Sequence, residues 1–478
     1  MVNLNSPKKN IIILGGGIPG IFSALYISKK HPEYQVHLVE SSGAIGGLYN
    51  SFIDKEAGIF DKGMHIIYET CIKEVDEIIR NCLPENDWLF LEGNNKDIAG
   101  VYHNNFLETN SPYVHIDSIK KRKINRCLAE LFLSFKNIAP SFLKCNNAED
   151  FFQKRFGKSI TTELIEPIIK KLWRTPLKKL HPASTRIVLM DRIRIFEEES
   201  TADLMKSEYI RSRIAYPNQM NLNKIYRNSQ RGLYPKNFGM SNLIKGMESK
   251  LKGLGVIVYK KSNIESIQIL KNKIQSVSIN IKDSKKEISD IKLFHSTIPS
   301  SKLFNLFGIK PKNYNFDKGL NQKYLFLLID SPPNMGDIYY FHSFNKGHKT
   351  YRVTNYAAYC PSSVRIHKKT NKKVWPVCVE LHYKNQNPNF NNIFKDGVKE
   401  LLQTKIIKSK NSIIFSRVES AGGFPLLTIK NCNLLKENDD IFENLNIENL
   451  LIAGQAPDKG IFFLHDILEN IFQSIKNI

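Results

Sequence analysis

The first forty residues show a change of hydrophobic pattern from strand to helix and back to strand. Residues 10–14 form a short aliphatic run, and residues 15–20 form a glycine-rich turn. Residues 21–30 carry apolar side chains at helical spacing. Residues 35–40, QVHLVE, alternate in the manner of a second strand. This order predicts a βαβ unit at the start of the chain.

The rest of the chain passes from helical patterning to strand patterning. Residues from about 116 to 226 are rich in helix formers with apolar side chains three and four apart, which predicts an inserted helical domain. The segment 239–252 predicts an amphipathic helix, and alternation then predicts successive strands. The clearest strands are 293–299, 324–330, 375–383 and a buried one at 449–455, which leads to a last helix.

The glycine turn has the chemistry of a dinucleotide site. Gly15 allows the tight bend, Gly17 lets the backbone approach a pyrophosphate, and Gly20 lets the helix pack close to the strand. The helix N-terminus stabilises phosphate charge, and Pro19 suits a helix start. Glu40 can accept hydrogen bonds from both hydroxyls of an adenosine ribose. The turn alone serves NAD or FAD equally, and a turn that binds nothing is the alternative.

Composition and charge indicate where the protein acts and which partners it has. The chain of 478 residues is 42% hydrophobic and 24% charged and has no run of eighteen apolar residues, so we expect a cytoplasmic protein without a signal segment. Seven scattered cysteines predict free thiols, and their spacing predicts no metal site. The net charge of +23 favours a solvated basic surface, with no nucleic-acid partner. Contact with an anionic membrane, at its inner face, stays open.

The residues after Glu40 resemble a flavoprotein superfamily. SSGAIGGLYNSF contains Gly46 and Gly47, and FDKGMHIIY contains Gly63 and His65. These segments are similar to those of the superfamily that includes amine oxidases, protoporphyrinogen oxidases, phytoene desaturases and UDP-galactopyranose mutases. There the acid is followed by a double glycine and by a D-x-G-x-H-like stretch beside the flavin ring. The resemblance implies FAD as the cofactor.

Later segments resemble the same superfamily in the expected order. Residues 151–187 look like a helical segment of protoporphyrinogen-oxidase-like proteins associated with bacterial polysaccharide synthesis, and residues 231–267 resemble a helix with a following strand pair. Residues 448–471 resemble the closing FAD motif. The residues that the resemblance implies at the cofactor are Gly15, Gly17, Ile18, Pro19, Gly20, Glu40, Ser41, Gly46, Gly47, Leu48, Gly63, His65, Ile264, Gly454, Gln455, Phe463, Leu464 and His465.

Two residues are candidates for catalysis or substrate binding. His65 could donate to the flavin or the substrate and is expected to titrate near neutrality, with a packed structural histidine as the alternative. Arg352, beside several tyrosines, could bind a substrate phosphate, whereas a surface salt bridge is the commoner fate of an arginine. For Trp173 we favour a place in the core, and for Asp61 a structural role.

Departures from the superfamily pattern leave the reaction open. Ala44 and Ile45 stand where amine oxidases usually have arginine, and Gln455 stands where mutases have one. We favour an FAD-dependent oxidoreductase that removes a hydride from a small or sugar-containing substrate, such as a nucleotide sugar or a lipid-linked sugar, in surface polysaccharide synthesis. The alternatives are a redox-neutral isomerase similar to UDP-galactopyranose mutase and a non-catalytic binding protein similar to GDP-dissociation inhibitors.

The predicted fold is α/β, with a Rossmann-type FAD-binding domain and an α+β substrate domain. The first has a parallel sheet with helices on both faces, and the second has an antiparallel sheet and a helical insertion. The FAD-binding domain is expected from residues 1–105, 231–300 and 426–478. The helical and substrate-domain insertion is expected from 106–230, and the antiparallel sheet from 301–425.

Overall fold

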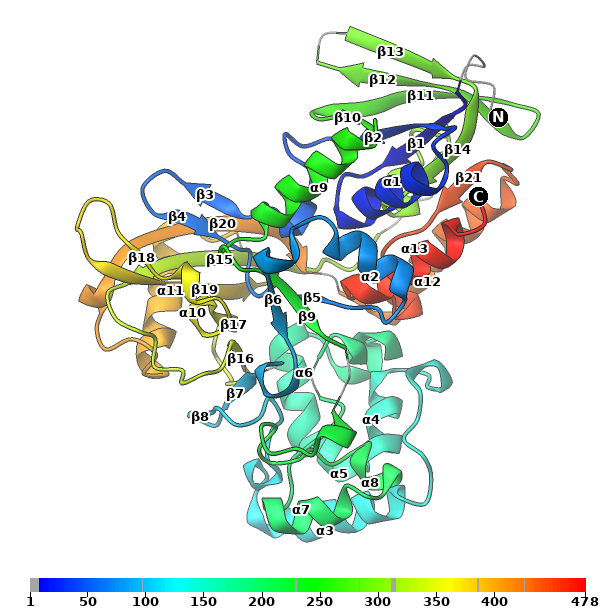
Figure 1. Ribbon diagram of the computed structural model, residues 1–478. Coiled ribbons are helices and arrows are strands. Elements are labelled where there is room, and N and C mark those ends of the chain that lie inside the picture. The colour runs from blue at the N-terminus through cyan, green and yellow to red at the C-terminus, as the bar shows by residue number, and fades with distance from the viewer. Residues whose placement is uncertain are drawn as a thin grey trace.

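The chain folds into three parts, which Figure 1 shows together. The computed structural model describes residues 8–478 except 97, 189, 228–229, 283, 311–314, 385–386 and 425. The first strand and the last helix both lie in the upper part, while an antiparallel sheet lies to one side and a helical part lies below. The upper part is therefore formed by separated segments of the chain, and the other two parts are inserted between them.

The upper part contains a five-stranded parallel sheet assembled from distant segments. Its strands are β1 (Asn10–Leu14), β2 (Gln35–Val39), β10 (Ile257–Tyr259), β14 (Ile291–Ser296) and β21 (Leu450–Ile452), in the order β10-β2-β1-β14-β21. All four pairings are parallel. The predicted strand at 449–455 is only three residues long and half-buried, because it forms an edge of the sheet.

The two faces of this sheet are covered differently. Apolar residues of α1 (Ile18–Lys30), α9 (Ser241–Gly253) and α13 (Leu464–Ile475) pack on one face. The other face packs mainly on an antiparallel sheet of β11 (Ser262–Leu270), β12 (Lys273–Ile281) and β13 (Ser284–Ser289), and α12 (Ile429–Asn444) covers only its end. Helices therefore lie on both faces, as predicted, but branched residues of β12 fill most of the space on the second face.

The second part is an eight-stranded sheet that is antiparallel except where β7 and β16 pair in parallel. Its main path is β20-β15-β19-β17-β16-β7-β8, and β18 pairs with β19. One face packs on α11 (Phe390–Gln403). The strands are β7 (Ala99–His103), β8 (Phe106–Glu108), β15 (Leu320–Ile329), β16 (Tyr340–Ser343), β17 (Thr350–Asn355), β18 (Arg365–Ile366), β19 (Lys373–Tyr383) and β20 (Ile413–Phe424).

The position of β7 differs from the predicted boundary at residue 105. Residues 99–103 were assigned to the FAD-binding domain, but β7 pairs with β16 of the antiparallel sheet from Ala99 to Tyr102. Its consecutive residues Val101 and Tyr102 point to opposite faces of the strand and pack into two different cores, those of the helical part and of the antiparallel sheet. A strand that pairs with a partner 240 residues away leaves no local sequence signal.

The helical part confirms the predicted insertion. It contains α3 (Lys121–Ser134), α4 (Ala148–Phe156), α5 (Lys158–Ile160), α6 (Glu166–Trp173), α7 (Glu198–Leu204) and α8 (Glu208–Arg211), with a core of its own. Trp173 is 1% exposed in that core, as expected. In the described part of the chain, no helix is long and apolar enough to span a bilayer.

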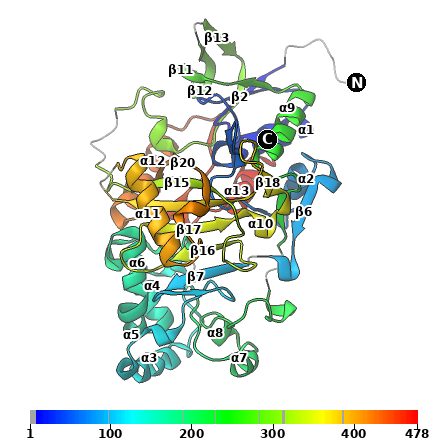
Figure 2. The same ribbon diagram turned by 90° about the vertical axis from the view of Figure 1, so that its left-hand side faces the viewer.

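Short elements join the three parts. Two small sheets consist of β3 (Phe52–Asp54) with β4 (Gly58–Phe60), and of β5 (Ile67–Tyr68), β9 (Gly232–Pro235) and β6 (Trp88–Leu91). The helices α2 (Lys73–Arg80) and α10 (Tyr356–Tyr359) lie near them. In the view of Figure 2 the helical part again lies at the end opposite the sheet β11-β12-β13.

A single buried amide fastens the edge strand β21. Asn449 donates to the carbonyls of Ile274 and Ile291 at 2.9 and 2.8 Å, and its Oδ1 accepts from the Ile274 N–H at 2.8 Å. The variant Asn449→Ala leaves those buried groups unpaired, so we expect the free energy of unfolding to fall by about 2–3 kcal/mol. Urea unfolding followed by circular dichroism measures this. The exposed Asn444→Ala is the control, and equal effects of both would contradict the role of Asn449.

Candidate functional site

The glycine turn joins β1 to α1 by close backbone packing. A Cβ placed on Gly20 would lie 1.8 Å from the carbonyl oxygen of Gly15, so no other residue fits there without moving the helix. Among the described residues, a Cβ on Gly17 would come within 4 Å of Pro19 alone, at 3.5 Å, so the space into which that Cβ would project is open. Gly17 is the N-cap of α1, and in the described part of the chain no side-chain hydrogen bond caps this helix end. The turn therefore presents open backbone at a helix N-terminus.

Glu40 is oriented by the turn itself. Its Oε2 accepts from the Gly16 N–H at 2.8 Å, and its Oε1 accepts from the Ser42 N–H at 2.7 Å. A carboxylate has about four acceptor positions, so Glu40 can accept further hydrogen bonds. The exposed Ser41 lies next to it. The side chain of Ile264 instead packs into the core between the two sheets of the upper part.

The double glycine lies against the turn. The Gly46 N–H donates to the carbonyl of Gly16 at 2.7 Å, and a Cβ on Gly47 would lie 3.4 Å from the Cα of Gly17. Gly46 has φ of 106°, which glycine adopts without strain. Leu48, which follows Gly47, is 56% exposed. The structure thus brings together two predicted segments that are thirty residues apart.

The closing segment reaches the turn through Thr297, just after β14. A Cβ on Gly15 would lie 2.6 Å from Thr297 Oγ1, and a Cβ on Gly454 would lie 2.5 Å from the Thr297 carbonyl oxygen. Thr297 Oγ1 also donates to the carbonyl of Leu14 at 3.1 Å. Gln455, the next residue, is exposed. Three distant segments therefore meet at the carboxyl edge of the parallel sheet, where α/β folds bind nucleotides.

The residues at the start of α13 lie farther along this side. Phe463 caps the helix, and the ring of His465 stacks on it at 5.9 Å and meets Tyr68 edge-on at 6.4 Å. Asp466 accepts from the Phe463 N–H at 3.2 Å and pairs with Arg186 at 3.1 Å. Leu464 is half-buried. These side chains border the site without touching the glycine turn.

His65 lies between the double glycine and the antiparallel sheet. Its ring meets that of Tyr49, two residues after Gly47, edge-on at 4.8 Å. Its Nδ1 is buried and has no hydrogen-bond partner among the described residues. Burial, with smaller contributions from the charges of Arg352 and Lys62, lowers the pKa of His65 to about 3. The expected titration near neutrality is therefore wrong, because this pocket disfavours the charged imidazolium.

Arg352 forms a buried ion pair instead of a surface salt bridge. Its Nε donates to Glu380, which is 1% exposed and also accepts from Gln322 at 2.8 Å. Burial by itself would lower the pKa of Arg352, but the charge of Glu380 raises it above the ordinary arginine value. A Cβ on Gly63 would lie 2.4 Å from Glu380 Oε1 and 2.9 Å from Arg352 Nη2. The pair thus sits directly beside the Gly63 to His65 segment.

A bulge in β17 places two consecutive side chains on the same face of the sheet. The register of β17 against β19 shifts between Thr350 and Arg352, so Tyr351 is the extra residue. Tyr351 stacks on His382 at 4.5 Å and 13° and lies 4.9 Å from the ring of His342. Arg352 lies over the same tyrosine at 6.0 Å. One face of the sheet therefore carries polar groups, while the other packs on α11.

The two histidines of this face are neutral near pH 7. Burial, together with the charges of Arg352 and Lys171, holds the pKa of His342 and of His382 well below the usual range. Nε2 of His342 is buried without a hydrogen-bond partner in the described part of the structure. The sequence VCVELHY carried a signal for this cluster, since Glu380 and His382 alternate with apolar residues on a strand. We had not used it.

Two other polar groups nearby are structural. Asp61 accepts from Ser51 Oγ at 2.6 Å, from the Tyr234 hydroxyl at 2.6 Å and from the Met240 N–H at 3.0 Å, which confirms its expected role. Lys171 of α6 donates to the carbonyls of Ser343 and Thr350 at 2.5 Å each, and burial lowers its pKa to about 7. The sequence had not singled out this lysine, which fastens the helical part to β16 and β17.

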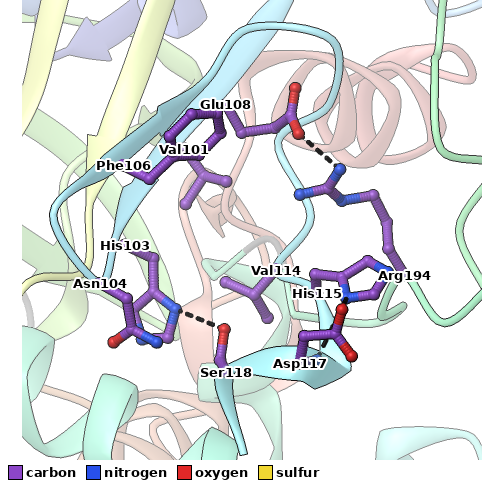
Figure 3. Close-up of a pocket in the computed structure, with 10 residues that line it drawn as sticks. All are labelled: Val101, His103, Asn104, Phe106, Glu108, Val114, His115, Asp117, Ser118 and Arg194. Carbon is purple, nitrogen blue, oxygen red and sulfur yellow. Dashed lines mark hydrogen bonds and ion pairs between the residues drawn. The ribbon is translucent and has the colours of Figure 1, made fainter.

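A separate cavity of about 210 Å³ lies under the β7–β8 hairpin. Figure 3 shows Glu108 bonded to Arg194, and His103 bonded to Ser118, on its wall. The side chains on its wall bond to one another, and none of them is a predicted site residue. We therefore assign the candidate site to the region between the glycine turn and the polar sheet face.

Comparison with known proteins agrees with this geometry. Residues 13–78 match the model of an NAD(P)-binding Rossmann-like domain. Over 324 residues the chain is 24% identical to coproporphyrinogen III oxidase from Staphylococcus aureus (strain NCTC 8325 / PS 47), a match that covers 63% of each chain. The matched part is thus less than two thirds of that relative's length.

Solved structures match over nearly the whole chain. The crystal structure of reduced UDP-galactopyranose mutase has a TM-score of 0.70 at 16% identity and covers 98% of this chain and 96% of its own. Together these matches support the predicted resemblance to the FAD-dependent amine oxidase-like superfamily. A protein from Exiguobacterium sp. 255-15, provisionally assigned as a protoporphyrinogen oxidase, has a TM-score of 0.66 at 12% identity over 99% of both chains. At such identities the solved structures show the fold alone, and they confirm the predicted fold class.

The low pKa of His65 has a measurable consequence. Its value falls from 6.5 in the ordinary state to about 3 in the folded protein, so the unfolded chain binds more protons between those pH values. Acidification through this window therefore favours unfolding. We expect the imidazole resonances of His65, assigned with His65→Gln, to keep neutral chemical shifts from pH 8 to about 4 and to titrate normally in urea. Titration of the folded protein near pH 6.5 would contradict this.

The buried ion pair predicts a non-additive pair of substitutions. Arg352→Met leaves the carboxylate of Glu380 buried without its cation, so we expect the free energy of unfolding to fall by about 3–5 kcal/mol. The double variant Arg352→Met/Glu380→Gln removes both charges and should recover most of this loss. The free energies of unfolding of these two variants, of Glu380→Gln and of the parent, measured by chemical unfolding, form a double-mutant cycle. Additive losses would argue against a direct pair.

Proposed function

We propose that this chain is an FAD-dependent oxidoreductase that removes a hydride from a small or sugar-containing substrate. The observation that carries the proposal is the contact between two predicted segments. The double glycine lies against the glycine turn, and His65 lies just beyond it, next to the polar face of the sheet. A cofactor that extends from Gly17 past Gly47 would end beside His65 and the Arg352–Glu380 pair.

The residues of the turn fit the adenosine diphosphate half of FAD. Gly17 leaves open space in front of the α1 N-terminus, where a pyrophosphate would accept from backbone N–H groups. Glu40 keeps acceptor capacity for the ribose hydroxyls. A carboxylate at this place disfavours a 2′-phosphate, which supports FAD over NADP. The match of residues 13–78 to an NAD(P)-binding Rossmann-like domain supports a nucleotide at this place.

The residues near His65 fit a flavin ring. FAD supplies a hydride acceptor when it is bound. His65 stays neutral, and its buried Nδ1 has a hydrogen-bonding position to offer to a polar ring atom or to the substrate. A neutral imidazole donates or accepts without adding charge beside the ring. The ring of Tyr49 covers one side of the His65 ring and excludes water there.

The polar sheet face would form the substrate wall. Arg352 is neutralised by Glu380, and His342 and His382 are neutral, so the wall offers hydrogen bonds and aromatic rings with little net charge. Such a wall suits a hydroxylated substrate better than a diphosphate. We therefore propose a sugar, as part of a nucleotide sugar or a lipid-linked sugar, with the sugar ring against this wall. A role in surface polysaccharide synthesis, in the cytoplasm, rests on the resemblance of residues 151–187 alone.

A redox-neutral mutase is the second candidate. The overlap with reduced UDP-galactopyranose mutase over 98% of this chain favours it. The neutralised Arg352 and the exposed Gln455 argue against it, because a nucleotide diphosphate needs positive partners. Turnover of a nucleotide sugar only after dithionite reduction, without use of an acceptor, would replace the oxidoreductase assignment by the mutase.

The direct test is a visible spectrum of the purified protein, followed by anaerobic titration with candidate sugars. We expect a flavin spectrum that is bleached by the true substrate, since the hydride leaves the substrate for the bound cofactor. Absence of a flavin spectrum, together with failure to take up added FAD, would favour a binding protein similar to GDP-dissociation inhibitors.

Gly17→Ala separates cofactor binding from folding. The added methyl group meets only Pro19, at 3.5 Å, so we expect stability within about 0.5 kcal/mol of the parent. The same methyl group would stand where the pyrophosphate approaches, and FAD retention should fall by about tenfold or more. Flavin content and thermal unfolding are measured side by side. Gly253→Ala, which meets no atom within 4 Å, is the control, and full retention of FAD by Gly17→Ala would count against this site.

A further inference from the structure

Large apolar side chains are exposed at the far end of the helical part. Phe132 is 50% exposed, Leu133 62% and Ile138 62%, although they lie within fourteen residues of the buried Cys127 and Leu131. Single exposed apolar residues are ordinary, whereas neighbouring ones mark an interaction site. In Figure 1 the helix α3, which carries Phe132 and Leu133, lies at the lower end, away from the upper part, and Ile138 follows it in the chain.

The outer face of α3 changes character along its length. Exposed residues recur at three and four positions, and they are Lys121, Arg122, Asn125, Arg126, Ala129, Phe132 and Leu133. The inner face packs Cys127 and Leu131 into the core of the helical part. The outer face is therefore basic in its first half and apolar in its second, and the chain continues through Lys136 to Ile138. This outer face is not explained by packing within the chain.

Positive charge dominates this surface. Residues 120–144 contain seven basic residues and one acidic residue, Glu130. Glu130 is occupied by Arg126 at 3.0 Å and by the Ser159 N–H at 2.6 Å. Lys123 pairs with Glu163 at 2.5 Å. Among the described residues, Lys121 and Arg122 have no carboxylate within ion-pair distance, so their charge faces solvent.

We propose that the α3 surface, formed by Lys121, Arg122, Phe132, Leu133, Lys136 and Ile138, docks on an anionic lipid bilayer. The apolar side chains would enter the boundary between headgroups and acyl chains, and the basic ones would contact anionic headgroups. A second copy of this chain is a poorer occupant, because two such basic surfaces and two chains of net charge +23 repel each other. The proposal does not depend on the proposed function.

The neighbouring acidic helix is compatible with this orientation. Glu198, Glu199 and Asp203 of α7 and Glu208 of α8 are acidic groups of the same helical part. Figure 2 shows α3 to the left and α7 to the right of the lower end, so a bilayer that contacts the left side of this end lies nearer to α3 than to α7. The α3 surface is therefore the basic and apolar side of this end.

Sedimentation with lipid vesicles tests the apolar part. The full chain is mixed with vesicles of phosphatidylcholine alone or with added phosphatidylserine, and we expect binding only to the second kind, weakened by salt. Leu133→Glu should reduce the partition coefficient by about tenfold or more. Leu270→Glu is the matched control, since Leu270 is 58% exposed at the opposite end of the molecule. An equal loss in both variants, or no binding by the parent, overturns the proposal.

Charge reversal tests the basic part. Lys121→Glu/Arg122→Glu should lower binding to the anionic vesicles by about tenfold or more, whereas Lys271→Glu/Lys282→Glu, in turns of the sheet β11-β12-β13, changes the net charge equally and should have little effect. Circular dichroism establishes that all variants fold. Gel filtration tests for a second copy. If the parent is a dimer and Leu133→Glu is a monomer, a second copy covers this surface and the proposal is overturned. Binding of the parent to an acidic protein but to no vesicle would also overturn it.

Discussion

The close packing of backbone around Thr297 is the constraint on which the site depends. Gly15, Gly20 and Gly454 come from the first and last parts of the chain, and a Cβ on any of them would overlap the turn or Thr297. This contact holds β1, β14 and β21 in register at their carboxyl ends. Because the glycines permit it, two chain ends more than four hundred residues apart form one nucleotide-binding edge.

Burial decides the electrostatics on the other side of the site. The polar face of the antiparallel sheet has an arginine, a glutamate and two histidines, yet the ion pair cancels one charge of each sign and desolvation keeps both histidines neutral. Lys171 fastens this face to the helical part through two carbonyls. A polar wall with little net charge follows from packing, and this is the reason for proposing a hydroxylated ligand.

Local chemistry made the nucleotide half of the site predictable. The spacing of Gly15, Gly17 and Gly20 to Glu40 follows from the geometry of one βαβ unit, and the structure joins Gly16 to Glu40 by a hydrogen bond. The helical insertion was also evident from periodicity. The antiparallel layer over β1 and the place of β7 were not, because both depend on which distant strand is available as a partner. The binding roles of the individual residues stay predictions.

The sequence by itself determined the βαβ opening and the order of the segments, since glycine spacing and hydrophobic period act over a few residues. Only the tertiary structure decided that Arg352 is neutralised by Glu380, that the bulge turns Tyr351 onto the same face, and that His65 stays uncharged. These properties depend on neighbours that are tens to hundreds of residues apart. Desolvation and ion pairing are set by the complete surroundings of a group, and these exist only after the chain has folded.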